Sequence, residues 1–158
     1  MHALLRTFGL AAALFISAAA LASEAVPVNA TFGIQWTPVD WNNPADRITE
    51  TLGAAGLPNG KTIGIATRDH LNVITGKITS DYVTLVFSDT DWVYAKYENI
   101  PAGFDPSTNT ASFGGPLQVV GGEGRFAGAT GTLAIRSRIL FSMPVGTFLV
   151  QGVIKTAK

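Results

Sequence analysis

The chain has 158 residues, no cysteine, and 11 basic against 11 acidic side chains. Without cysteine it can form no disulfide, and the balanced charge gives no electrostatic reason to expect binding to nucleic acid or to an anionic membrane surface. Since charged residues make up only 14% of the chain, we expect a compact folded protein and not a disordered one.

Residues 1–22 are predicted to be a secretory signal peptide. A weakly basic opening with Arg6 precedes the apolar stretch FGLAAALFISAAALA, which is too short to span a bilayer comfortably. The stretch ends in Ala20-Leu21-Ala22, a small-x-small pattern that signal peptidases accept. We expect cleavage after Ala22, with Ser23-Glu24-Ala25 as a second site and an uncleaved N-terminal anchor as the alternative. The protein is therefore expected to be exported, periplasmic or secreted, with no membrane span after cleavage.

The remaining residues, 23–158, have a length that fits a single domain. Runs rich in valine, isoleucine, threonine and aromatic residues, bounded by turn residues, predict strands. These runs are 30–39, 61–69, 72–79, 81–89, 92–100, 111–121, 132–142 and 146–156. We expect an irregular connection over 41–61, with a helical turn around Ala45 to Leu52 capped by Asn42 or Asn43, and a loop over 101–110.

About eight strands with short connections indicate an all-β, antiparallel barrel or sandwich. An eight-stranded antiparallel β-barrel is favoured because closure removes the exposed edges that long apolar strands would present. In the strand 132–142, Leu133 and Ile135 share one face while Arg136 and Arg138 share the other. The period of two therefore predicts that the apolar face points inward and both arginines point to solvent.

The segment GGEGRFAGATG, residues 121–131, has five glycines in eleven positions. A phosphate-binding loop would require a lysine and a following helix, whereas a strand follows here. The dinucleotide-binding pattern also fails, because its third glycine, Gly128, stands one position late. We interpret the segment as a backbone corner with a tight turn whose Phe126 plugs one end of the barrel. The residues assigned to this corner are Gly121, Gly122, Gly124, Arg125, Phe126, Gly128, Ala129 and Gly131.

This corner resembles the G-G-x-G-[RK]-F-x-x-A-x-G segment of the allene oxide cyclase and dirigent barrel superfamily, which small exported bacterial proteins share. Glu123 stands where threonine is frequent, and the close match covers about eleven residues. The resemblance implies an eight-stranded barrel, often oligomeric, with an apolar cavity. Plant relatives cyclise an unsaturated epoxide or steer phenoxy-radical coupling, but the resemblance places no catalytic residue in this chain.

The candidate ligand-binding residues are aromatic and arginine side chains on predicted strands, since aromatic walls with few polar groups suit a flat apolar ligand. They are Trp36, Arg68, Phe87, Tyr97, Arg136 and Arg138. The alternatives are a filled core for the aromatic residues and solvated strand faces for the arginines. Asp69 and His70 cannot pair as in a catalytic triad, because neighbours in a strand point to opposite faces, and they are interpreted as a surface turn. No metal site and no cofactor are expected, and Asp89 and Asp91 are interpreted as a polar turn.

Three functions remain open from these observations. The first is an exported barrel that binds a small apolar or aromatic ligand. The second is a cofactor-free isomerase or cyclase, in which a carboxylate, tyrosine or arginine polarises the substrate. The third is a structural subunit of a homo-oligomer.

Overall fold

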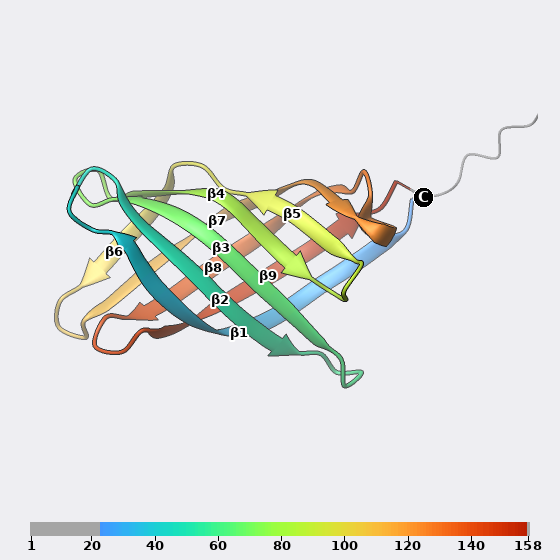
Figure 1. Ribbon diagram of the computed structural model, residues 1–158, viewed down its shortest axis with the longest axis horizontal. Coiled ribbons are helices and arrows are strands. Elements are labelled where there is room, and N and C mark those ends of the chain that lie inside the picture. The colour runs from blue at the N-terminus through green and yellow to red at the C-terminus, as the bar shows by residue number, and fades with distance from the viewer. Residues whose placement is uncertain (1–22, 158) are drawn as a thin grey trace, which may run out of the picture.

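The computed structural model describes residues 23–157, which form an all-β, closed, eight-stranded antiparallel barrel (Figure 1). The signal peptide predicted over residues 1–22 lies outside the described residues. The strands are β1 (Ala25–Asp40), β2 (Arg47–Gly56), β3 (Thr62–Asn72), β4 (Lys77–Val86), β5 (Trp92–Lys96), β6 (Ile100–Asp105), β7 (Thr110–Glu123), β8 (Thr130–Leu140) and β9 (Val145–Lys155). A 3₁₀ turn, η1 (Gly124–Phe126), lies between β7 and β8.

The ring closes because every strand pairs on both sides. β1 pairs with β2 and β9, β3 pairs with β4, and β7 pairs with β8. The short strands β5 and β6 together occupy one position, since β4 and β7 each pair with both of them. The predicted fold class, an eight-stranded antiparallel barrel, is confirmed.

Three of the predicted element boundaries are wrong. The segment expected to be irregular with a helical turn contains β2, because its backbone pairs with β1 on one side and β3 on the other. The expected strands 72–79 and 81–89 are largely the single strand β4, preceded by a turn in which Gly76 has φ of 61°. The expected loop 101–110 contains most of β6, which is paired with β7.

The barrel interior follows the period of two. Inward-pointing side chains such as Phe32, Phe148 and Ile135 are fully buried. In β8 Leu133 and Ile135 are buried while Arg136 and Arg138 are exposed, so the predicted face assignment of this strand is confirmed. The centre of the barrel is therefore a packed core, as small barrels usually have.

The glycine-rich segment closes one end of the barrel. Phe126 of η1 is fully buried and packs against Phe87 with ring centroids 4.7 Å apart. The backbone N–H of Arg125 donates to the carboxylate of Asp91 at 3.1 Å. Gly124 has φ of 59°, and a Cβ there would lie 2.3 Å from the carbonyl oxygen of Thr90, so only glycine fits without strain.

No helix in residues 23–157 is both long enough and apolar enough to cross a membrane.

Candidate functional site: an aromatic pocket at the open end of the barrel

The two ends of the barrel differ. η1 covers one end, and the connections β1–β2, β3–β4, β6–β7 and β8–β9 meet at the other, on the left of Figure 1. A pocket of about 510 Å³ lies at this second end, which we call the open end. Its lining residues are Trp41, Arg47, Leu71, Val73, Gly76, Ala102, Gly103, Phe104, Asn109, Ala111 and Phe141. Residues from every connection at this end therefore contribute to one site.

A second, smaller space of about 40 Å³ adjoins the pocket on its inner side. Trp41, Leu71, Ala111 and Phe141 line both spaces, while Trp36, Thr49 and Asp69 line only the inner one. The inner space has room for about one water molecule, and it places a carboxyl group at the bottom of the site.

The aromatic wall consists of four rings, of which three contact one another and the fourth contacts one of them. Trp36, near the end of β1, stacks on Trp41 with ring centroids 5.4 Å apart and planes 13° apart. Phe141, just after β8, meets both indoles edge-on, and Phe104 of β6 meets Phe141 edge-on at 5.5 Å. Such contacts stabilise the rings in one arrangement and present a flat apolar surface.

The carboxyl group at the bottom belongs to Asp69 of β3, whose exposed fraction is only 2%. The Tyr97 hydroxyl donates to Oδ1 at 2.6 Å and the Thr67 hydroxyl donates to Oδ2 at 2.6 Å. Each carboxylate oxygen keeps a further lone pair for another donor. Asp69 is the only acidic side chain among the residues that line the two spaces.

Burial changes the protonation of this group. Desolvation raises the pKa of Asp69 from its ordinary 3.8 to about 6, and the hydrogen bonds from Thr67 and Tyr97 oppose part of that rise. Burial and the neighbouring Asp69 charge raise the pKa of Tyr97, so its hydroxyl stays protonated as a donor. Asp69 can therefore gain or lose a proton near neutral pH, as an acid–base group requires.

Tyr97 lies in the short break between β5 and β6, where its backbone is bound to β4. Its backbone N–H donates to the Ser80 hydroxyl of β4 at 2.9 Å, and Asn99 adopts a positive φ of 51° just before β6 begins. Opposite this break, the β3–β4 pairing shifts register between Arg68 and Asp69. The first irregularity follows Tyr97 by two residues and the second borders Asp69, so both adjoin the hydrogen bond between these two side chains.

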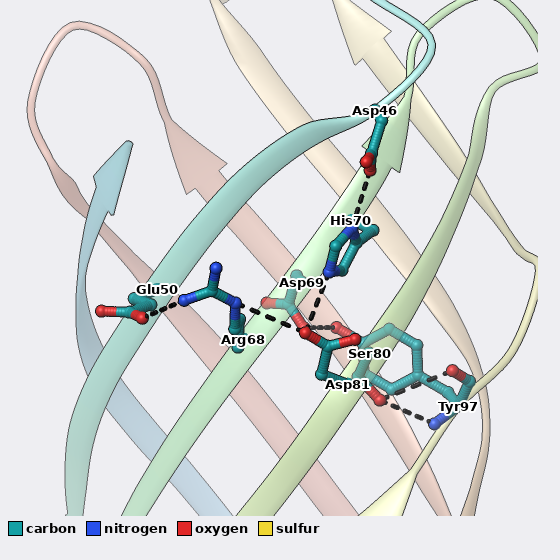
Figure 2. A network of polar contacts seen from close by, with 8 residues as sticks. All are labelled: Asp46, Glu50, Arg68, Asp69, His70, Ser80, Asp81 and Tyr97. Carbon is teal, nitrogen blue, oxygen red and sulfur yellow. Dashed lines mark hydrogen bonds and ion pairs between the residues drawn. The ribbon is translucent and has the colours of Figure 1, made fainter. Parts of the chain in front are cut away.

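On the outer face of the same strands lies a charged cluster (Figure 2). His70 contacts Asp46 through Nδ1 at 2.7 Å and Asp81 through Nε2 at 2.9 Å. Arg68 pairs with Glu50 at 2.7 Å and with Asp81 at 3.4 Å. The surface turn expected at Asp69 and His70 is wrong, because both residues lie within β3 and pair with β4. As adjacent strand residues, Asp69 points inward and His70 points outward, so they form no triad.

The structure brings only two of the six candidate ligand-binding residues to the pocket region. Trp36 lines the inner space, and Tyr97 lies beside it with its hydroxyl on Asp69. Phe87 packs on Phe126 near the closed end. The arginines Arg68, Arg136 and Arg138 lie on the outer face, because they alternate with inward-pointing neighbours. These four side chains do not line the pocket.

Sequence reasoning missed Asp69, Trp41, Arg47, Phe104 and Phe141. A signal for Asp69 was present, since Ile63, Ile65, Thr67 and Asp69 alternate along one strand and the two isoleucines mark the inward face. No comparable signal existed for the others, because they lie at strand ends or in connections that only the closed barrel brings together. Among residues 23–157, no three His, Cys, Asp or Glu side chains are arranged so that they could hold a metal ion.

Comparison with protein-family models, curated proteins and solved structures finds no match to this chain. The likeness of residues 121–131 to the allene oxide cyclase and dirigent barrels therefore stays a prediction.

Proposed function

We propose that this barrel binds a small apolar or aromatic molecule in the pocket at its open end. The observation that carries the proposal is an aromatic-walled pocket of about 510 Å³ leading to the buried carboxyl group of Asp69. Ligand sites are typically concave and mostly apolar, with a few convergent polar groups that set orientation. Trp41 and Phe141 supply the apolar surface, and Asp69 supplies the polar group that would orient a hydroxyl or amide of the ligand.

The test is to fill the pocket without disturbing the rest of the barrel. Ala111 lines both the outer and inner spaces, whereas Ala134 is exposed on the outer face of β8. Ala111→Phe should abolish binding of the neutral dye N-phenyl-1-naphthylamine, followed by its fluorescence increase, and Ala134→Phe should bind it as the unchanged protein does. Equal binding by the unchanged protein and Ala111→Phe would place the dye elsewhere and contradict the proposal.

A second candidate function is a cofactor-free isomerase or cyclase of the allene oxide cyclase type. It is favoured by the contact between Asp69 and Tyr97, which joins a carboxyl group with a pKa of about 6 to a buried phenol. Such a pair can move a proton to or from a substrate held in the pocket. If an unsaturated epoxide is rearranged by the protein, Asp69→Asn should remove most of the turnover while N-phenyl-1-naphthylamine still binds. Unchanged turnover in Asp69→Asn would exclude this role for the carboxyl group.

We further propose that the protein is exported and related to the allene oxide cyclase and dirigent barrels. The support is the segment 121–131, together with a closed eight-stranded barrel. An exported protein of this kind would meet its ligand outside the cytoplasm, where extracellular pH varies and Asp69 and His70 would change their charges.

A further inference from the structure

Arg47 lines the outer pocket without a counter-ion. It is the first residue of β2, and its guanidinium lies over the Trp41 ring, 5.1 Å from the centroid. Among residues 23–157 it forms no ion pair. The carboxylates nearest to it along the chain are engaged elsewhere, since Asp46 contacts His70 and Glu50 pairs with Arg68. An arginine that lines an apolar pocket without an anionic partner points to an anion supplied from outside.

Each side chain of this stacked pair has one buried hydrogen-bond donor. Arg47 Nε and Trp41 Nε1 are both buried with no hydrogen-bond partner in the described part of the chain. Leaving buried donors unpaired costs free energy, so a bound group that gives them a partner would be favourable. The stacking of the guanidinium on Trp41 keeps the two side chains together at the pocket wall.

We propose that the pocket binds an organic anion, a flat or apolar molecule that carries one carboxylate, sulfonate or sulfate group. This inference rests on the proposed ligand-binding function and names the class of ligand. The Arg47 guanidinium binds the anionic group, and the rings of Trp41, Phe104 and Phe141 contact the apolar part. A guanidinium suits this task because its planar donors match the oxygens of such groups.

The positions of the charges set the direction of binding. Asp69 lies in the inner space and is ionised above a pH of about 6, so an anionic group is repelled from the bottom of the pocket. Arg47 lines only the outer space. The anionic group therefore stays at the open end while the apolar part extends inward. A cationic ligand is disfavoured at the open end by the charge of Arg47.

The experiment compares two dyes that share one apolar skeleton. The anionic dye 8-anilino-1-naphthalenesulfonate and the neutral N-phenyl-1-naphthylamine differ by a sulfonate group. Both are titrated into the full chain and into Arg47→Met, with Arg138→Met as the matched control, because Arg138 is an exposed arginine on the outer face of β8. Arg47→Met should weaken binding of the anionic dye by about tenfold or more, which corresponds to loss of a charge-assisted contact, and change binding of the neutral dye less than about twofold. Arg138→Met should change neither.

The outcomes separate this inference from the proposed function. If the neutral dye binds, and Ala111→Phe blocks it, but the anionic dye binds equally to the unchanged protein and to Arg47→Met, the anion site is wrong and the ligand pocket stands. If neither dye binds the unchanged protein, or Ala111→Phe has no effect, the pocket itself is wrong. If Arg47→Met does not fold, Arg47→Gln and Arg47→Lys are compared instead. Weaker binding of the anionic dye to Arg47→Gln than to Arg47→Lys supports the anion site. Equal binding to the two variants overturns it.

Discussion

Asp69 is the buried ionisable side chain of the pocket. It is buried, it accepts two hydrogen bonds at 2.6 Å, and it lines the inner part of the pocket. A carboxyl group in this position resists ionisation, because the charged form loses its hydration, and the two hydroxyl groups and the charge of His70 compensate only part of that loss. That resistance has a measurable consequence for the free energy of unfolding.

The folded-state pKa of Asp69, about 6, lies above the ordinary 3.8. Since the unfolded chain releases this proton first, the carboxyl group makes the fold less stable as pH rises from 3.8 to 6, by about 3 kcal/mol. Asn at this position cannot ionise. The stability of Asp69→Asn relative to the unchanged protein should therefore rise by about 3 kcal/mol between pH 3.5 and pH 7.5, measured by urea unfolding at both values. A difference that is the same at both pH values would show that Asp69 ionises freely in the fold.

The charged cluster of Figure 2 links the connection 41–46, which contributes to the pocket wall, to strand β3. The connection 41–46 carries Trp41 and Asp46, and Asp46 contacts His70 on β3. The charged groups around His70 are Asp46 before β2, Asp81 on β4, and Arg68 on its own strand, which also engages Glu50 of β2. A neutral imidazole can donate from only one nitrogen, so both contacts require the protonated ring.

The hydrogen bond and charge of Asp81 raise the pKa of His70, and Asp46 adds to the rise. The stabilisation is therefore complete below the ordinary value of 6.5 and is lost as pH rises through the folded-state value. Backbone amides of 41–46 should exchange with deuterium roughly three to ten times faster at pH 8.5 than at pH 5.5, after correction for intrinsic rates. His70→Gln should exchange fast at both.

The matched control for this measurement is Lys96→Gln, which breaks the Lys96–Glu98 ion pair on another part of the barrel. It should behave as the unchanged protein does. Equal protection of 41–46 at both pH values in the unchanged protein would mean that the contact with Asp46 does not hold this connection in place.

The whole molecule depends on a seam between its first and last strands. β1 and β9 pair over eleven positions from Ala25–Lys155 to Gln35–Val145, and Phe32 lies directly opposite Phe148. Both phenylalanines are fully buried, and Phe148 also contacts Phe113 of β7 at 5.7 Å. The closed ring thus joins distant parts of the chain in one core and should unfold as a single unit.

Phe148→Ala should lower the free energy of unfolding by about 3 to 5 kcal/mol, because it removes a buried ring and leaves a cavity at the seam. Its neighbour Thr147 is exposed, so Thr147→Ala should change the value by less than about 0.5 kcal/mol. Urea unfolding followed by near- and far-ultraviolet circular dichroism provides the measurement. Non-coincident curves in the unchanged protein would contradict a single cooperative core.

The local sequence pattern was sufficient to predict those features of the fold that depend on a single segment of the chain. The alternation of β8, the strand content and the turn at residues 121–131 follow from side-chain periodicity and from the conformational freedom of glycine. β2 was not predicted, because its alanine, glycine and threonine residues show only a weak alternation of apolar and polar side chains. It is a strand because its backbone pairs with β1 and β3, although its local strand propensity is low.

By itself, the sequence determined that this chain is neutral, cysteine-free and all-β, because these properties follow from composition and a period of two, and it favoured an antiparallel barrel over a sandwich. Closure itself was decided by the pairing of the first and last strands. Tertiary structure alone decided where the pocket lies. Trp41, Arg47, Asp69 and Phe141 are far apart along the chain and acquire a common role only when the barrel closes and its connections meet at one end. Closure also placed Asp69 away from water, which gave an ordinary carboxyl group its raised pKa.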